Sequence, residues 1–378
     1  MTAEIAIMNR LAVVLAADSA TTVTYWNKGT KTERYFKGAN KLFQLSNGQP
    51  VGLMIYATAS LHGVPWDIIV KEFRRCLGDD VLPKLSDYCD RFCAFIKGQM
   101  TLFPDALRKT SLVNNATQAA YQLVYKMQAR EKKGEGRSDA LKHVLEEAEA
   151  DLAAATLPEW LTEDDKEAAV AAHAAAIERY VDDQKLIEGA DANLKRRLAS
   201  IAVGIALVHF KRFMGSSGIV IAGYGNDEFF PSFYSFRCFG FLDSHFLWMQ
   251  TNEGHTSDDK PATIEPFATT SMINTFQMGI SPDVFEQVTQ ATTNCLRTFS
   301  EELRSHIDFV GPLPDIEPLI KDASDKHTKE WFYPSLGTHY DPLAAVIGSL
   351  PVADMAALAK SLIELESLKE RVPNRASR

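Results

Sequence analysis

The chain has 378 residues, 46% of them hydrophobic, so it can bury a large core as one elaborated domain or as two. Its formal net charge of -9 argues against a nucleic-acid surface, which needs clustered Lys and Arg. Five cysteines are an odd number in a large chain, so we do not expect a disulfide framework.

The start of the chain does not have the pattern of a secretory signal. The apolar run Leu11–Ala17 is at the short limit for such a signal, and Glu4 offsets Arg10 where a positive region is needed. No other run approaches the roughly 18 apolar residues of a membrane span. We therefore expect a cytoplasmic protein that does not contact the membrane.

The first residues of the chain predict a hairpin with chemical groups at one end. Two apolar runs, Ala3–Met8 and Leu11–Ala17, suit buried strands joined by a turn. Thr2 precedes the first run, and removal of Met1 would leave a threonine with a hydroxyl and a free amine. The second run leads to Asp18, so a carboxylate is expected near that terminus. The hairpin therefore predicts a nucleophile, a base and an acidic neighbour.

The first half of the chain divides into a β part and a helical part. Residues 1–60 predict an antiparallel unit of about four strands, and a helix with one apolar face begins at Trp66. Residues 113–192 predict an inserted helical arm rich in Ala and Glu. Within it, Thr162 and Asp165 have the spacing of a capping box at the start of a helix.

The second half repeats this order. Ile219–Tyr224 and Ser232–Phe239 read as strands, and Ser281 begins a helix with proline at its first position. Gly311–Asp341 reads as a Pro-rich irregular region, and Val352–Arg371 as a final helix. The apolar stripe expected on that helix is Met355, Leu358, Leu362, Leu365 and Leu368. The order predicts an α+β fold of antiparallel sheets layered with helices.

No familiar cofactor or metal motif is present. The chain has no G-x-S-x-G elbow, phosphate-binding glycine loop, H-E-x-x-H or dinucleotide fingerprint. His245, His255 and Asp258 match no known metal-site spacing, and Cys89 with Cys93 suits helix packing better than a metal pair. We therefore expect neither a cofactor nor a metal.

Three segments together resemble the opening of proteasome β-subunits. They are Thr2 followed by Leu-Ala-Ala-Asp18, then Asn40-Lys41-Leu-Phe-Gln-Leu45, then Ile55-Tyr-Ala57. The wider layout is similar to a bacterial proteasome-like group. The resemblance implies an N-terminal-nucleophile (Ntn) hydrolase with an αββα sandwich. It also implies that 1–112 and 193–378 form the core, that 113–192 is an inserted arm, and that about 280–341 is a second insertion.

The resemblance also implies a role for each site residue. Thr2 Oγ would attack a carbonyl, and the Thr2 amine would take the proton. Lys41 would hold positive charge beside the nucleophile, and Asp18 would pair with Lys41 and orient it. The backbone N–H of Ala57, where the family more often has glycine, would supply the oxyanion hole. Ser271 is a weaker supporting candidate, since it occupies the place of a turn near the nucleophile.

The resemblance leaves the activity open between three functions. The family has an Asp-x-x-Ser-Gly-Gly-like turn after its final helix, and residues 373–378 contain no such motif. The leading expectation is a threonine protease of the cytoplasm that cleaves peptide or protein amide bonds as a homo-oligomer, without nucleic-acid partners. The alternatives are a catalytically inactive scaffold subunit and a small-amide amidase or acylase of the same fold.

Overall fold

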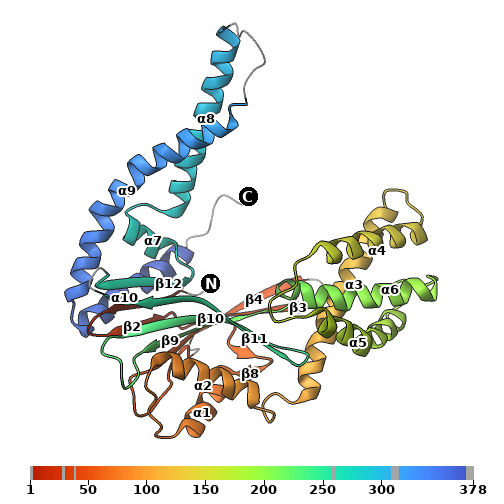
Figure 1. The fold of residues 1–378 in the computed structure, drawn as a ribbon, viewed down its shortest axis with the longest axis horizontal. Helices are drawn as coiled ribbons and strands as arrows, with labels where there is room; N and C mark the ends of the chain where they lie inside the picture. The colour runs from red at the N-terminus through yellow and green to blue at the C-terminus, as the bar shows by residue number, and fades with distance from the viewer. Residues whose placement is uncertain (1–2, 28–29, 38–39, 258–259, 308–314, 372–378) are drawn as a thin grey trace.

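The computed structural model of the chain describes residues 3–27, 30–37, 40–257, 260–307 and 315–371. Figure 1 shows a body of stacked sheets and helices from which two helical parts extend, an arm on one side and a long hairpin at the top. Within the described residues, no helix is long and apolar enough to cross a membrane.

One antiparallel sheet has the strand order β12-β1-β2. Its strands are β1 (Ala3–Asn9), β2 (Val13–Ala17) and β12 (Ala262–Ala268). Alternation along β1 sends Ile5 and Ile7 into one apolar cluster and Ala6 and Met8 into another. Both faces of β1 are buried, which explains its continuous apolar run, and the predicted β1–β2 hairpin is confirmed.

The second antiparallel sheet has the order β11-β10-β9-β6-β5. Its strands are β5 (Leu42–Gln44), β6 (Gly52–Ala57), β9 (Ser217–Gly223), β10 (Ser232–Leu242) and β11 (His245–His255). A Cβ atom at Gly218 would lie 1.9 Å from Cζ of Tyr56, so only glycine lets this ring pack across the sheet. Antiparallel pairing in both sheets confirms the predicted α+β class.

The predicted four-strand unit in residues 1–60 is wrong. β1 and β2 belong to the first sheet, and β5 and β6 belong to the second. The other strands here form two separate hairpins: β3 (Ala20–Asn27) with β4 (Thr30–Lys37), and β7 (Ser60–Leu61) with β8 (Val64–Pro65). Residue patterns predicted the strands but not their partners, because β1 also pairs with β12 at the far end of the chain.

Helices cover the outer face of each sheet. On the five-stranded sheet they are α1 (Trp66–Leu77) and α2 (Leu85–Gly98), and on the three-stranded sheet they are α7 (Ser271–Met278), α9 (Glu317–Ser349) and α10 (Val352–Arg371). Between the two sheets lies a separate apolar cluster that includes Met8, Met54, Val220 and Phe233. The body thus consists of four packed layers with three apolar interfaces.

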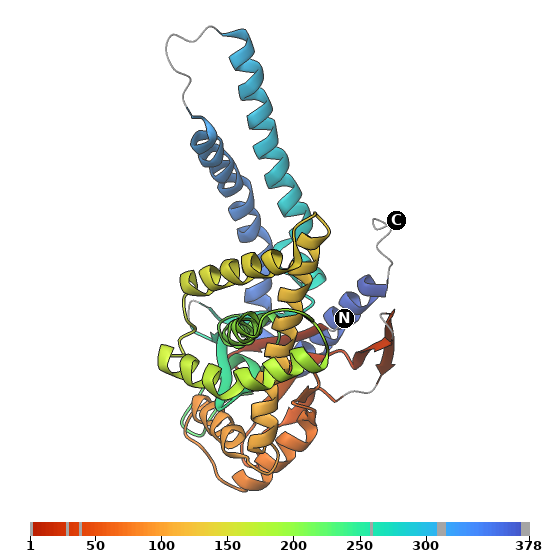
Figure 2. The ribbon, with the colours of Figure 1, turned by 90° about the vertical axis from the view of Figure 1, so that its right-hand side faces the viewer.

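The arm consists of four helices and one short 3-10 turn. They are α3 (Asp105–Glu131), α4 (Arg137–Ala154), α5 (Glu163–Asp183), α6 (Ala192–Val208) and the turn η1 (Phe210–Arg212). The helices share one apolar cluster, and Figure 1 shows them gathered beside the body, while in Figure 2 they face the viewer. The predicted capping box is confirmed, since Thr162 accepts a hydrogen bond from the backbone N–H of Asp165.

The predicted irregular region Gly311–Asp341 is wrong over its described part. Helix α8 (Pro282–His306) is followed by α9, which continues through Pro334 and Pro342. Each proline removes one backbone hydrogen bond. α9 packs against α7, α8 and β12. Figures 1 and 2 show α8 and α9 as a hairpin that projects from the body.

The predicted stripe on the final helix is wrong in part. Met355 and Leu362 are buried as expected, whereas Leu365 and Leu368 are 48% and 57% exposed. Ala359, Ile363 and Glu366 are buried on this helix instead. A carboxylate therefore lies where the apolar pattern alone placed leucines.

Candidate functional site

The candidate site begins at the first described residues of β1. Thr2, the predicted nucleophile, lies outside the described residues. Ala3 follows it, and its carbonyl accepts a hydrogen bond from the backbone N–H of Asp18 at 2.9 Å. Glu4 Oε1 forms an ion pair with Lys41 Nζ, also at 2.9 Å. Asp18 and Lys41 are therefore both held by the two residues that follow Thr2.

The strand pairing explains this convergence. In the β1–β2 hairpin Glu4 lies opposite Ala17, so the next residue of the chain, Asp18, arrives beside Ala3. Lys41 precedes β5, and its carbonyl accepts a hydrogen bond from the N–H of Ile55 in β6 at 2.9 Å. Glu4 occupies an even position of β1, on the same face as the residues that enter the cluster between the sheets.

The ion pair of Lys41 differs from the expected one. The resemblance implied that Asp18 would pair with Lys41, but the carboxylate that lies against the ammonium is that of Glu4. Glu4 is fully buried and Lys41 is 9% exposed. Removing either partner of a buried pair leaves the other charge without compensation, so loss of this pair would be strongly destabilising.

Ala57 ends β6 with a backbone conformation that favours glycine. Its φ is 69°, and Ala268 at the end of β12 has a φ of 58°. Ala268 pairs with Ala3, and the rings of Tyr56 and Phe267 lie 5.7 Å apart between centroids. The end of β6 thus approaches the strand that pairs with the start of β1, and two non-glycine residues adopt a costly conformation there.

A buried serine supports the segment that follows Ala57. Ser217 Oγ accepts a hydrogen bond from Trp66 Nε1 at 2.9 Å and donates one to the Thr58 carbonyl at 3.1 Å. The Thr58 hydroxyl oxygen lies 2.5 Å from Ser217 Oγ. These contacts hold the chain immediately after Ala57, so its backbone N–H has a defined direction.

Ser271 is linked to the end of α10. Its hydroxyl donates to Glu366 Oε1 at 3.1 Å and accepts from Lys369 Nζ at 2.8 Å. The backbone N–H groups of Met272 and Ile273 donate to Glu366 Oε2 at 2.7 and 3.3 Å. Glu366 therefore caps the N-terminus of α7, where a helix dipole favours negative charge.

The same turn of α10 reaches Asp18. Ser367 Oγ donates a hydrogen bond to Asp18 Oδ2 at 3.1 Å. Neighbouring residues of one helix, Glu366 and Ser367, thus contact Ser271 and Asp18. Of the predicted residues, Asp18 and Ser271 are connected through α10, and Lys41 is connected to Glu4 instead.

Sequence reasoning missed Glu4, Glu366 and Ser367. A signal existed for Glu4, which is a lone charge inside an otherwise apolar strand and therefore needed a buried partner. No comparable signal marks Glu366, because α10 also carries Asp354 and Glu364, which are exposed.

The structure offers no metal centre in its described part. Among those residues, no group of three or more His, Cys, Asp or Glu side chains is arranged to hold a metal ion. Burial raises the pKa of Cys93 to about 11 and raises that of the neighbouring Cys89. Both thiols are thereby kept in the protonated form at neutral pH. Asp258 lies outside the described residues.

Comparison of the chain with models of protein families, with curated proteins and with solved structures finds no match.

Proposed function

We propose that this chain is a proteasome-like threonine hydrolase, which cleaves peptide or protein amide bonds once Met1 has been removed. The observation that carries the proposal is the convergence of Asp18 and Lys41 on Ala3 and Glu4. Successive Cα atoms lie about 3.8 Å apart across a trans peptide. The covalent bond to Ala3 therefore limits how far Thr2 can lie from both groups.

The layer order supports the fold that this mechanism requires. Helices cover the outer faces of two antiparallel sheets that pack against each other. We assign this arrangement to the αββα sandwich of N-terminal-nucleophile hydrolases. In this proposal, α3 to α6 form an arm inserted into the sandwich, and α8 with the first part of α9 forms a second insertion.

In the proposed reaction, Thr2 Oγ attacks the carbonyl carbon of the substrate, and the Thr2 amine takes the hydroxyl proton, directly or through water. The ammonium of Lys41 lowers the proton affinity of both groups. The backbone N–H of Ala57 donates to the oxyanion, and such a donor typically contributes roughly 3 kcal/mol to lowering the barrier. The tetrahedral adduct then collapses to an ester on Thr2 Oγ as the C–N bond breaks, and the leaving amine takes the proton from the Thr2 ammonium. Water attacks this ester with the Thr2 amine again taking the proton, and the acid leaves as that proton returns to Thr2 Oγ.

Two roles differ from those that the resemblance implied. Glu4 is the carboxylate that holds Lys41, so Glu4 is the positioning residue for that ammonium. Asp18 is held by Ser367 and by its backbone bond to Ala3, so its role is to position the start of β1. Contacts from α10 to Asp18 and Ser271 take the place of the family's supporting turn.

Intact-mass measurement and covalent labelling test the proposal. We expect the untagged protein to have lost one methionine, and an epoxyketone that needs both hydroxyl and amine to label it. Thr2→Ser keeps both groups and should retain labelling, whereas Thr2→Ala should abolish labelling and peptide hydrolysis. Thr110→Ala, an exposed threonine in α3, is the control. Retention of Met1, or equal labelling of Thr2→Ala, would rule out the mechanism.

A second candidate is a catalytically inactive scaffold subunit of a homo-oligomer. It is favoured by the buried Glu4 carboxylate, which offsets the charge of Lys41 beside the proposed nucleophile. A protein that forms oligomers but shows neither labelling nor hydrolysis of peptides and small amides would support it. Hydrolysis of small amides alone would point to an amidase or acylase.

A further inference from the structure

The outer edge of β11 borders a groove. β11 is the terminal strand of the five-stranded sheet, so half of its backbone N–H and C=O groups point away from β10. Within the described residues, no backbone hydrogen bond from a loop or turn reaches this edge. Figure 1 shows β10 and β11 reaching toward the arm, and the groove of about 700 Å³ lies where they meet it.

Five consecutive residues of the strand, Phe246–Gln250, line one wall of the groove. The opposite wall comes from the arm, from the loop 156–160 before α5 and from residues 208–212 at the end of α6. None of these segments contributes a residue to the proposed catalytic site. A run of five strand residues offers about 17 Å of backbone edge, which suits an extended peptide.

Trp160 and Phe210 form an aromatic wall on the arm side of the groove. The Trp160 ring packs against Phe210 at 5.6 Å and against His245 at 5.0 Å between centroids, so it joins the arm to the start of β11. Its Nε1 atom is buried and has no hydrogen-bond partner among the described residues. A buried donor left in this state is costly.

The groove also carries positive charge in a chain with a net charge of -9. Lys211 and Arg212 line it, are exposed, and have no ion-pair partner in the described part of the structure. Glu159 is the carboxylate in the lining. Burial and the neighbouring Arg212 lower the pKa of His209, so this ring adds little charge at neutral pH. The two cations favour an acidic ligand.

We propose that an extended acidic peptide segment of a partner protein binds in this groove as an added strand on β11. Its backbone pairs with the outer edge of Phe246–Gln250, as in other cases of strand addition. Its apolar side chains pack on the aromatic wall, and its carboxylates contact Lys211 and Arg212. The partner is thus recognised by β-pairing together with charge.

Binding of synthetic peptides tests both parts of the proposal. The probe is a fluorescein-labelled peptide of alternating Val and Glu, and the matched peptide has Lys in place of Glu. Binding is followed by fluorescence anisotropy on the full chain carrying Thr2→Ala, so that cleavage cannot remove the probe. The outcome therefore does not depend on whether the chain is a hydrolase. We expect the Glu peptide to bind, the Lys peptide to bind more weakly, and salt to weaken the former.

Two further comparisons separate the charge from the backbone pairing. The double substitution Lys211→Glu with Arg212→Glu should weaken binding of the Glu peptide roughly tenfold. Lys321→Glu with Lys326→Glu, two exposed lysines of α9, is the control of equal charge change and should leave binding unaltered. Peptides N-methylated on alternate residues, in both registers, should differ, because only one set of N–H groups faces β11.

Several results would overturn the proposal. They are absence of binding by the Glu peptide, equal binding of the Glu and Lys peptides, wild-type affinity in the Lys211→Glu, Arg212→Glu protein, and equal binding of the two N-methylated peptides.

Discussion

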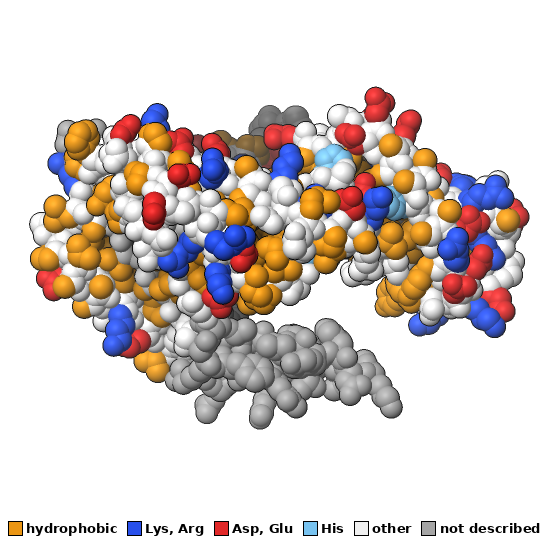
Figure 3. All heavy atoms as spheres, turned by 90° about the horizontal axis from the view of Figure 1, so that it is seen from below, with side chains coloured by type: hydrophobic (Ala, Val, Ile, Leu, Met, Phe, Trp, Pro, Cys, Tyr) orange, Lys and Arg blue, Asp and Glu red, His pale blue; other side chains and the backbone are white. Residues whose placement is uncertain are grey.

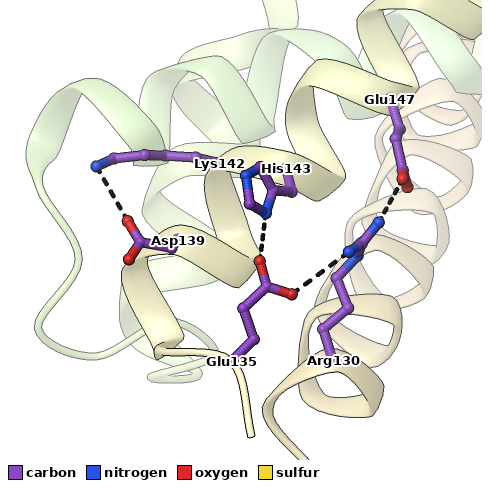
Figure 4. Close-up of polar contacts among 6 residues, drawn as sticks. All are labelled: Arg130, Glu135, Asp139, Lys142, His143 and Glu147. Atoms are coloured by element: carbon purple, nitrogen blue, oxygen red, sulfur yellow. Dashed lines mark hydrogen bonds and ion pairs between the residues drawn. The ribbon is translucent and has the colours of Figure 1, made fainter. Parts of the chain in front are cut away.

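The sheet body and the helical arm use charged residues in opposite ways. In the body, Glu4 and Lys41 are buried; Glu4 lies in β1, and Lys41 comes 37 residues later, just before β5. In the arm, Arg130 of α3, Glu135 of the loop before α4 and His143 of α4 interact with one another, and their side chains are 33%, 23% and 55% exposed. Figure 4 shows this arm network, and Figure 3 shows charges of both signs covering the end of the arm.

This difference indicates which charged residues contribute to the stability of the fold. A buried ion pair has lost its hydration, so removing one partner leaves the other charge uncompensated. An exposed pair exchanges contacts with water and ions at little net gain. Substitutions in the body should therefore affect folding, whereas the same substitutions in the arm should scarcely do so.

Glu4→Gln should have the largest effect. It leaves the Lys41 ammonium buried without a carboxylate, and we expect the free energy of unfolding to fall by about 3 kcal/mol. Urea unfolding at constant m-value measures this change. The double substitution Glu4→Leu with Lys41→Met removes both charges and should restore most of the stability. If Glu4→Gln left the free energy of unfolding unchanged, the pair would not be buried as described.

Glu366→Gln should have an intermediate effect. The carboxylate is fully buried and accepts from two backbone N–H groups and from Ser271. The amide lacks the negative charge that the N-terminus of α7 favours and offers one accepting oxygen instead of two, so we expect a loss of about 2 kcal/mol in the free energy of unfolding. Glu364→Gln, exposed on the same helix, is the matched control. Equal losses in both variants would contradict the capping role.

His143→Ala in the arm should have the smallest effect. The hydrogen bond with His143, helped by Arg130, holds the pKa of Glu135 below its usual value. A carboxyl whose folded-state pKa is lowered stabilises the fold above its unfolded pKa of about 4.3, and the effect is lost as pH falls further.

The measurement is the unfolding midpoint of His143→Ala and wild type between neutral and acid pH. We expect closely similar midpoints at neutral pH and a weaker loss of stability with acid in the variant. If His143→Ala lowered the stability at neutral pH as much as Glu4→Gln does, the expected difference between buried and exposed ion pairs would be contradicted.

Local patterns predicted elements well where the reason was local. Alternation and apolar runs predicted β1, β2 and β9, and the capping box predicted the start of α5 at Glu163. They failed for α9, because proline is judged from its local cost and the compensating contacts come from distant elements. They failed for the stripe on α10 because Glu366 is satisfied only by residues of α7.

In the candidate site, too, local patterns suggested residues, whereas distant contacts decide how they are arranged. Thr2, Asp18, Lys41, Ala57 and Ser271 remain predictions as catalytic residues, and the pattern that suggested them lies in three short segments. Their geometry depends on contacts that no local pattern contains. The identity of the partner of Lys41 is the clearest case, since the carboxylate that pairs with it, Glu4, is farther away in the sequence than Asp18.

The sequence by itself determined many of the strands and helices but not α9, together with the hairpin that follows Thr2 and the absence of familiar metal or cofactor motifs. Only the tertiary structure decided that β1 joins β12, that Glu4 holds Lys41 and that α10 reaches Asp18 and Ser271. The physical reason is that backbone preference and alternation act over a few residues. A buried charge, in contrast, needs a partner, and that partner can come from a distant part of the chain.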